Sequence, residues 1–169
     1  MPASSGKPTL RIGLISDTHG LLRPEALRAM RGSDYIVHAG DIGDPAILEQ
    51  LARIAPVTAV RGNNDKGPAY ARIAETDVLQ AGEALIYVIH DLNELDLDPA
   101  AADFQLVVSG HSHRPSSQLR DGVLYVDPGS AGPRRFSLPI AAACLYITGK
   151  TVEAELLDLF ASPSGRGRA

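Results

Sequence analysis

Short apolar segments alternate with polar segments along the first third of the chain. Residues 24–30 and a segment that begins at Asp44-Pro45 follow the helical period, and Asp44 is the expected N-cap of the second helix. The apolar segments on either side of these two helices have the length and composition of buried strands, and they cover residues 10–16, 34–39 and 57–61. This β-α-β-α-β order predicts parallel strands joined by right-handed crossovers.

The pattern changes after residue 65, where strands predominate. Asp121-Gly122 and Gly149-Lys150 are two-residue hairpin signals, and Asp98-Pro99 predicts a short helix that ends at Phe104. The expected strands cover residues 73–79, 84–89, 105–109, 118–120, 123–126, 140–147 and 152–157. Hairpins that follow βα units predict an α/β sandwich of two packed sheets with helices outside. We expect a single domain at residues 10–160, with mobile ends at 1–9 and 161–169.

Five apolar segments end in side chains that can bind a metal ion. These side chains are Asp17 and His19; Asp41; Asn63 with Asn64 and Asp65; His90 with Asp91; and His111 with His113. In open α/β sheets ligands bind beyond the carboxyl ends of the strands, so the fold would gather these groups at one edge. Residues two apart in extended backbone point to the same side, so we expect His111 and His113 to face one point.

These groups predict two metal sites that share one carboxylate. We assign Asp17, His19, Asp41 and His113 to the first site, and Asp41, Asn63, His90 and His111 to the second. Asp41 bridges, because one carboxylate has two oxygens. Two divalent ions, two carboxylates and a bridging hydroxide leave about one net positive charge, which suits an anionic phosphate ester. The expected nucleophile is this metal-bridging hydroxide and not a protein side chain. Mixed imidazole, carboxylate and amide ligands favour manganese, iron, zinc or nickel over magnesium or calcium. Ligand type does not select among these four, of which manganese is our first choice.

Composition narrows the class of protein. With 169 residues, 44% hydrophobic and 21% charged, the chain can form one soluble domain with a substantial core. A net charge of -4 and only 5% aromatic residues argue against a nucleic-acid partner. The single cysteine, Cys144, excludes an intramolecular disulfide, and we expect it to be a buried thiol. Residues 1–8 lack the apolar stretch of a signal peptide and no segment resembles a membrane span, so we expect a cytoplasmic protein.

The five motifs together resemble those of the calcineurin-like metallophosphoesterases. They read Asp17-x-His19, Gly40-Asp41, Gly62-Asn63-x-Asp65, His90 and Gly110-His111-x-His113. The resemblance covers residues 10–158 and is strongest to the short form without a cap domain, the small bacterial and archaeal phosphodiesterases. It implies a four-layer αββα sandwich of two mixed β-sheets flanked by helices, a dinuclear centre with Asp41 bridging, and hydrolysis of phosphate esters.

Two positions depart from that family pattern. Many relatives carry a histidine where this chain has Asn64, which donates a hydrogen bond but does not transfer a proton at neutral pH. Close relatives often have a second, substrate-facing histidine in the fourth motif, where this chain reads His90-Asp91-Leu92. We therefore expect slow hydrolysis of poor leaving groups, whereas an activated aryl diester should be a usable test substrate.

Several polar residues near the motifs have assigned or open roles. Asp65 is expected to orient a ligand or solvent. Arg114 either reaches a phosphate or is a plain surface arginine, and Arg134 and Arg135 lie in a loop that the resemblance places near the site. His38 interrupts a buried strand and is expected to be a hydrogen-bonded core residue.

The predicted function is that of a metal-dependent phosphodiesterase acting on a small phosphate ester. The alternatives are a phosphomonoesterase on the same centre and a non-catalytic binding scaffold on the same fold, since the retromer scaffold subunit resembles this family yet has a degenerate metal centre. Retention of seven candidate ligands favours an enzyme. The sequence leaves the subunit count open, a homo-oligomer included.

Overall fold

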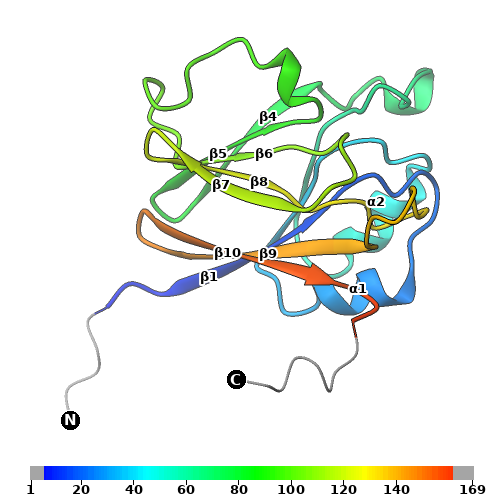
Figure 1. Ribbon diagram of the computed structural model, residues 1–169, viewed down its shortest axis with the longest axis horizontal. Helices are drawn as coiled ribbons and strands as arrows, with labels where there is room; N and C mark the ends of the chain where they lie inside the picture. Colours follow the sequence, from blue (N-terminus) through cyan, green and yellow to red (C-terminus); the bar gives the residue numbers. More distant parts are fainter. Residues whose placement is uncertain (1–5, 162–169) are drawn as a thin grey trace.

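Within residues 6–161, which the computed structural model describes, ten strands form two stacked five-stranded sheets (Figure 1). The first sheet has the order β10-β9-β1-β2-β3, and its strands are β1 (Thr9–Ile15), β2 (Tyr35–His38), β3 (Val57–Ala59), β9 (Ala141–Thr148) and β10 (Thr151–Asp158). Neighbours β1, β2 and β3 are parallel, and β9 is antiparallel to both β1 and β10. The predicted β-α-β-α-β unit therefore forms as expected.

The second sheet has the order β4-β5-β6-β8-β7. Its strands are β4 (Thr76–Ala81), β5 (Ala84–Ile89), β6 (Leu106–Val108), β7 (Ser116–Arg120) and β8 (Val123–Asp127). β5, β6 and β8 are parallel to one another, whereas β4 and β7 form antiparallel hairpins at the two edges. Both sheets are thus mixed, and in each sheet the polar motifs follow strands that have a parallel neighbour.

The core lies between the sheets and follows the two-residue period of the strands. Ile12 and Leu14 of β1 pack against Ile86 and Val108 of the second sheet, and all four are fully buried. The residue between them, Gly13, faces helix α1 (Pro24–Met30), where a Cβ atom would lie 2.6 Å from the sulfur of Met30. Alternation along β1 therefore serves both the intersheet core and the helical layer.

The two outer faces are covered in different ways. Helices α1 and α2 (Ala46–Ala52) pack on the first sheet through Met30 and Leu51. The N-cap of α2 is Pro45 and not the predicted Asp44, although the N–H of Ala46 donates to Asp44 Oδ1 at 3.0 Å. The second sheet is covered by the 3₁₀ helix η2 (Leu92–Glu94) and the turns that follow it, through contacts that include Phe104. The four-layer αββα class is therefore confirmed, with turns and a 3₁₀ helix as the fourth layer.

The predicted helix from Asp98 to Phe104 is wrong. Asp98 Oδ1 accepts from the N–H of Ala100 at 3.1 Å, as an N-cap would, but the segment forms only turns. Asp103 adopts a left-handed backbone with φ 66°, which ends the helical path within about one turn. An N-cap signal alone is therefore not enough to sustain a helix in so short a segment.

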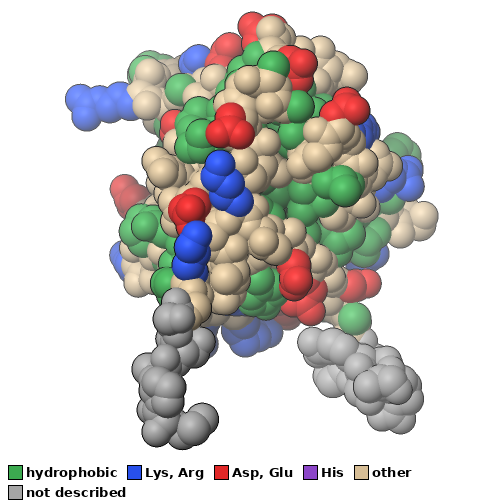
Figure 2. Space-filling view, turned by 90° about the vertical axis from the view of Figure 1, so that its left-hand side faces the viewer, with side chains coloured by type: hydrophobic (Ala, Val, Ile, Leu, Met, Phe, Trp, Pro, Cys, Tyr) green, Lys and Arg blue, Asp and Glu red, His purple; other side chains and the backbone are tan. Residues whose placement is uncertain are grey.

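The end of the sandwich with the β7–β8 and β9–β10 turns faces the viewer in Figure 2. Acidic, basic and hydrophobic side chains are interspersed there, and no histidine of the described residues is visible on this face. No helix within residues 6–161 is long and apolar enough to cross a membrane. The predictions of mobile ends fall mainly on residues 1–5 and 162–169, outside the described residues, while Thr9 already belongs to β1.

Candidate metal centre

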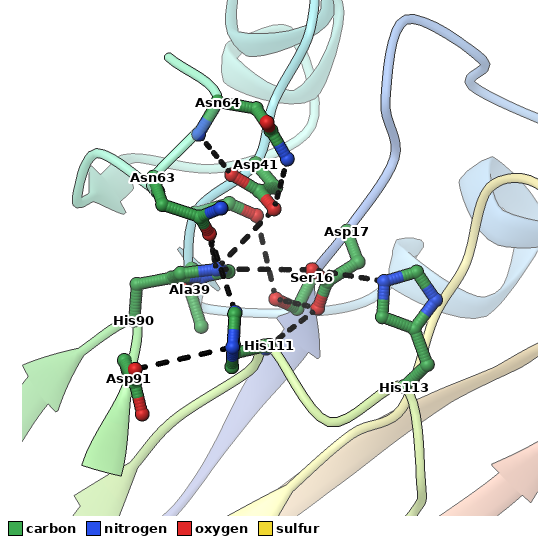
Figure 3. A network of polar contacts seen from close by, with 12 residues as sticks. Ser16, Asp17, Ala39, Asp41, Asn63, Asn64, His90, Asp91, His111 and His113 are labelled. Atoms are coloured by element: carbon green, nitrogen blue, oxygen red, sulfur yellow. Dashed lines mark hydrogen bonds and ion pairs between the residues drawn. The ribbon is translucent and has the colours of Figure 1, made fainter. Parts of the chain in front are cut away.

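Two groups of three side chains meet where the parallel strands of both sheets end, and Figure 3 labels five of the six residues, all but His19. Asp17, His19 and His113 form the first group, and Asp41, His90 and His111 form the second. Within each group the candidate ligand atoms lie within 4.8 Å of one another. Six residues from four separate segments of the chain are thus gathered in two adjacent clusters, as the motifs predicted.

Asp41 lies between the two groups. Its Oδ2 atom is 3.6 Å from His19 Nε2 in the first group and 3.3 Å from His90 Nε2 in the second. Asn63 joins the second group, because its Oδ1 lies 3.1 Å from His90 Nε2 and 3.2 Å from His111 Nδ1. All seven candidate ligands therefore lie close together, and Asp41 is near a histidine of each group; its bridging role stays a prediction.

Asp17 tests whether a cation fits between these side chains. Its Oδ2 accepts from Ser16 Oγ at 2.8 Å and from the N–H of His111 at 3.1 Å. Its Oδ1 is buried and has no hydrogen-bond partner among the described residues, yet it lies 3.4 Å from His113 Nε2 and 3.7 Å from His19 Nε2. A buried anionic oxygen beside imidazole nitrogens without a hydrogen bond is the donor set of a transition-metal ion. The residues present therefore fit divalent ions.

The backbone at five of the candidate ligands is left-handed and not extended. Residues Asp17, His19, Asp41, His111 and His113 have φ values of 54°, 45°, 55°, 72° and 61°. The expectation that His111 and His113 face one point is wrong, because sharp turns direct them into different groups. Their assignment to separate sites nevertheless agrees with the geometry. Such φ values are uncommon outside glycine and are concentrated at functional sites.

Glycines let the ligand loops approach one another. A Cβ atom at Gly62 would lie 2.1 Å from Asp41 Oδ1, and one at Gly110 would lie 2.1 Å from Ser16 Oγ. At Gly40 it would lie 2.6 Å from Nδ1 of His90. The glycine in each of these motifs is therefore required by close packing of one ligand segment on another.

Asp65 and Asn64 hold Asp41 in place. The buried Asp65 carboxylate accepts from the backbone N–H groups of Ile42 at 3.0 Å, Gly43 at 3.1 Å and Gly62 at 2.9 Å. Asn64 donates to Asp41 twice, from its backbone N–H at 2.9 Å and from Nδ2 at 3.0 Å. The turn that carries Asn63 is thus fastened to the loop that carries Asp41.

Comparison with known proteins identifies the family. The sequence model described as a calcineurin-like phosphoesterase superfamily domain matches residues 10–150. The chain belongs to the calcineurin-like phosphoesterase superfamily. A probable metallophosphoesterase of Methanothermobacter thermautotrophicus is 32% identical over 157 residues, which cover 86% of this chain and 91% of that protein. A phosphodiesterase of Methanocaldococcus jannaschii is 23% identical, over 83% of this chain and 88% of that protein.

A solved structure shares the fold of this phosphoesterase-family chain. Vacuolar protein sorting 29 from Entamoeba histolytica, complexed with zinc, superimposes with a TM-score of 0.67 and 20% sequence identity. The match covers 89% of this chain and 99% of that one. The resemblance read from the five motifs is therefore confirmed at the level of family and fold, and the family implies divalent metal ions.

Asp127 and Ser112 support the phosphoesterase site, and neither was among the residues singled out from the motifs. Asp127, the last residue of β8, accepts from Ser112 Oγ at 2.6 Å and from the N–H of Gly129 at 2.9 Å. Ser112 lies between His111 and His113, so Asp127 fixes the turn that presents both. Burial raises the pKa of Asp127 to about 6. The signal was present, because Asp127 also ends a parallel strand.

His38 is a buried support and not a ligand, as expected. The N–H of Gly40 donates to His38 Nδ1 at 3.2 Å, so the ring proton is on Nε2, which donates to Thr18 Oγ1 at 3.0 Å. The Thr18 hydroxyl donates in turn to the carbonyl of Ile42 at 2.8 Å. Burial lowers the pKa of His38 to about 4, so the ring is neutral and joins the loops after β1 and β2.

The phosphoesterase centre is strongly charged. Burial alone would raise the pKa of Asp17, but contacts with His113 and His19 outweigh it and hold the pKa well below its usual range. Burial opposes ionisation of Asp41 in the same way, and the contact with His90 again prevails and lowers the pKa. In His90, burial favours the neutral ring, but Asp41 and the charge of Asp17 raise the pKa to about 9. Both carboxylates are thus ionised at neutral pH.

The protonation of His90 makes a testable prediction for the metal-free protein. Its pKa is about 9 in the folded chain against 6.5 for an ordinary histidine, so its stabilising contribution is complete below pH 6.5 and is lost as the pH rises through 9. In the presence of a chelator we expect the melting temperature to fall across this window. Bound metal should reverse the trend, because ions displace the proton and bind more tightly as the pH rises.

Differential scanning calorimetry across this pH range, with and without a chelator, checks the prediction. His90→Asn is the matched control, because it removes the titrating ring and should flatten the metal-free profile. A melting temperature of the wild-type chain that stays constant in chelator between pH 6.5 and 9 would contradict the prediction.

Two hollows flank the phosphoesterase centre. One, of about 500 Å³, lies on the side of Asn63 and His90 and is also lined by Asp91. Asp91 Oδ2 is 3.9 Å from His111 Nε2. The other, of about 320 Å³, lies on the side of His19 and His113. The exposed side chain of Arg114 makes no hydrogen bond or ion pair within residues 6–161, so its predicted role stays a prediction.

Proposed function

We propose that the chain is a metal-dependent phosphodiesterase that hydrolyses a small phosphate ester with two divalent ions, manganese being our first choice. The observation that carries the proposal is the position of Asp41 Oδ2, within 3.6 Å of a histidine nitrogen in each of the two groups. Two bound ions would supply positive charge for the phosphoryl oxygens and activate water as the nucleophile. The chain itself then needs no protein nucleophile.

The side chains of the centre suit an anionic substrate. Asp17 and Asp41 are the only two carboxylates in the two ligand groups, and His19, His90, His111 and His113 add no negative charge. Two carboxylates do not neutralise two divalent ions, so a positive potential remains for the ester. The amide of Asn63 contributes an oxygen without a further charge.

The open surroundings favour a diester over a monoester. A phosphodiester carries two substituents, and the hollows of about 500 Å³ and 320 Å³ leave room for one on each side of the centre. The relative from Methanocaldococcus jannaschii is described as a phosphodiesterase, which supports the same choice. A phosphomonoesterase would use only one of the two spaces.

The histidines limit the leaving groups that this site accepts. The chain has five, of which four belong to the ligand groups and the fifth, His38, is buried with both ring nitrogens bonded. Asn64 is directed at Asp41 and carries no transferable proton. No imidazole is therefore left to protonate a departing alkoxide. We expect fast turnover only where the leaving group needs no protonation.

Turnover of bis(p-nitrophenyl) phosphate with added manganese tests the proposal. We expect release of p-nitrophenolate that stops with a chelator, and a higher kcat/KM than for p-nitrophenyl phosphate. Iron, zinc and nickel serve as comparison metals. Absence of turnover with all four metals, while metal analysis shows bound ions, would favour the binding scaffold, and a preference for p-nitrophenyl phosphate would favour the phosphomonoesterase. The cytoplasmic location and the subunit count stay predictions.

A further inference from the structure

The charged side chains that line the hollow beside His19 and His113 are all positive. Besides these two histidines it is lined by Pro133, Arg134 and Arg135, and no acidic side chain lines it. The hollow on the opposite side of the centre has Arg61 and Lys66 in its wall, but these cations are offset by acidic residues, namely Asp65, Glu75, Asp91 and Glu94. The two spaces available to a substrate therefore differ in sign.

The positive charge in the first hollow is not used within the protein. Arg135 is exposed, and its guanidinium group makes no hydrogen bond or ion pair within residues 6–161. Among the described residues, the Arg134 side chain donates only from Nη1, to the carbonyl of Leu138 at 3.1 Å. Both arginines line the hollow, so an anion bound there would be attracted by two positive charges.

The base of the arginine loop is fixed to the metal centre. The N–H of Ala131 donates to the carbonyl of Ser16 at 3.0 Å, and Ser130 Oγ donates to the carbonyl of Asp17 at 3.0 Å. At Gly132 a Cβ atom would lie 2.2 Å from the carbonyl oxygen of Thr18, so the loop leaves the centre in direct backbone contact. The base of the loop that carries the two arginines is therefore anchored directly beside the candidate metal centre.

We propose that this hollow binds a second anionic group, a carboxylate or a phosphate, carried by a substituent of the scissile ester. The inference rests on the proposed function and narrows its substrate class to esters with an additional negative charge. Two bound ions already serve the single charge of a phosphodiester, whereas Arg134 and Arg135 remain for another anion. Arginine binds carboxylate and phosphate with paired, charge-assisted hydrogen bonds, so both anions fit the same space.

A binding measurement isolates this contact from catalysis. We compare 2-carboxyethylphosphonate with propylphosphonate, which have chains of similar length and differ in the terminal carboxylate. Isothermal titration calorimetry on the manganese-loaded chain should give about tenfold tighter binding of the carboxylate compound, a difference that high salt weakens. Arg135→Ala should remove the difference and Arg135→Glu should reverse it. Arg53→Ala, an exposed arginine at the end of α2, is the matched control and should keep it.

A turnover measurement shows whether Arg135 binds the additional anion or the scissile phosphoryl group. The substrates are three phosphodiesters with a p-nitrophenyl leaving group, and their second substituent is propyl, 2-carboxyethyl or 2-phosphoethyl. The inference predicts higher kcat/KM for both anionic substrates and loss of that preference in Arg135→Ala. An equal fall for all three substrates would show that Arg135 binds the scissile phosphoryl group and would overturn the inference. So would no preference in the wild-type chain.

The two proposals fail in different ways. If the carboxylate preference in binding is present and depends on Arg135 but no ester is hydrolysed, the anion site stands and the phosphodiesterase proposal falls. If esters are hydrolysed without any carboxylate preference, the phosphodiesterase proposal stands and the anion site falls.

Discussion

Replacement of Asp41 by alanine is expected to lower kcat for bis(p-nitrophenyl) phosphate by more than about a hundredfold, since loss of residues that only support metal ligands already lowers activity 10–100-fold. Asp41 Oδ2 is near both ligand groups, at 3.6 Å from His19 Nε2 and 3.3 Å from His90 Nε2. Removal of the carboxylate therefore weakens both sites together. Elemental analysis after dialysis should find fewer than two ions per chain.

The matched control for this variant is Asp77→Asn. Asp77 is an exposed carboxylate of β4 that, within residues 6–161, accepts only from the N–H of Val78. Its loss changes the net charge equally without touching the ligand groups. Activity and metal content should stay at wild-type values. An Asp41→Ala chain that kept two ions and normal turnover would refute the bridging role of Asp41.

The second large effect is expected for Gly62→Ala. The added Cβ would lie 2.1 Å from Asp41 Oδ1 and 2.3 Å from the backbone nitrogen of Asp41, so the loop that carries this carboxylate must move. We expect a loss of about 1–3 kcal/mol in the free energy of unfolding, as for other overpacked sites, and at least tenfold weaker metal binding. Calorimetric unfolding and metal titration measure the two effects on one preparation.

Gly122→Ala separates crowding from backbone strain. Gly122 lies in the β7–β8 turn with φ 80°, and a Cβ atom there would meet no heavy atom within 4 Å. We expect a loss of about 1 kcal/mol from the left-handed backbone alone, with metal affinity unchanged. Wild-type metal affinity in Gly62→Ala would show that the contact between the Gly62 and Asp41 segments does not position the carboxylate.

The positions of the ligand segments were predictable because the sequence marks where parallel strands end. Apolar segments before Asp17, Asp41 and His90 are strands in the structure, and the carboxyl ends of parallel strands meet at one edge of a sheet. The groupings of Asp17 with His113 and of His90 with His111 also follow the prediction. Local composition and strand direction therefore determine which of these segments lie close together.

The local conformation of these segments was not predictable by the same reasoning. The spacing of His111 and His113 suggested extended backbone, whereas tertiary contacts impose left-handed turns with φ 72° and 61°. The turns after Asp98 show the same limit, because a capping side chain does not reveal how soon the chain leaves the helical path. Asp127 was missed because it is followed directly by a proline and has no histidine near it in the sequence, so it looks like an ordinary turn residue.

The left-handed backbone at five of the candidate ligands has a consequence for evolution under selection. Each of these non-glycine residues stores about 1–2 kcal/mol of conformational strain, which glycine at the same position would release. Directed evolution for heat resistance in a chelating medium should therefore favour glycine at His111, whose side chain is the most exposed of the five. The thermostable variants would then bind metal poorly. Selection for metal-dependent activity and selection for a more stable fold therefore act in opposite directions on this backbone.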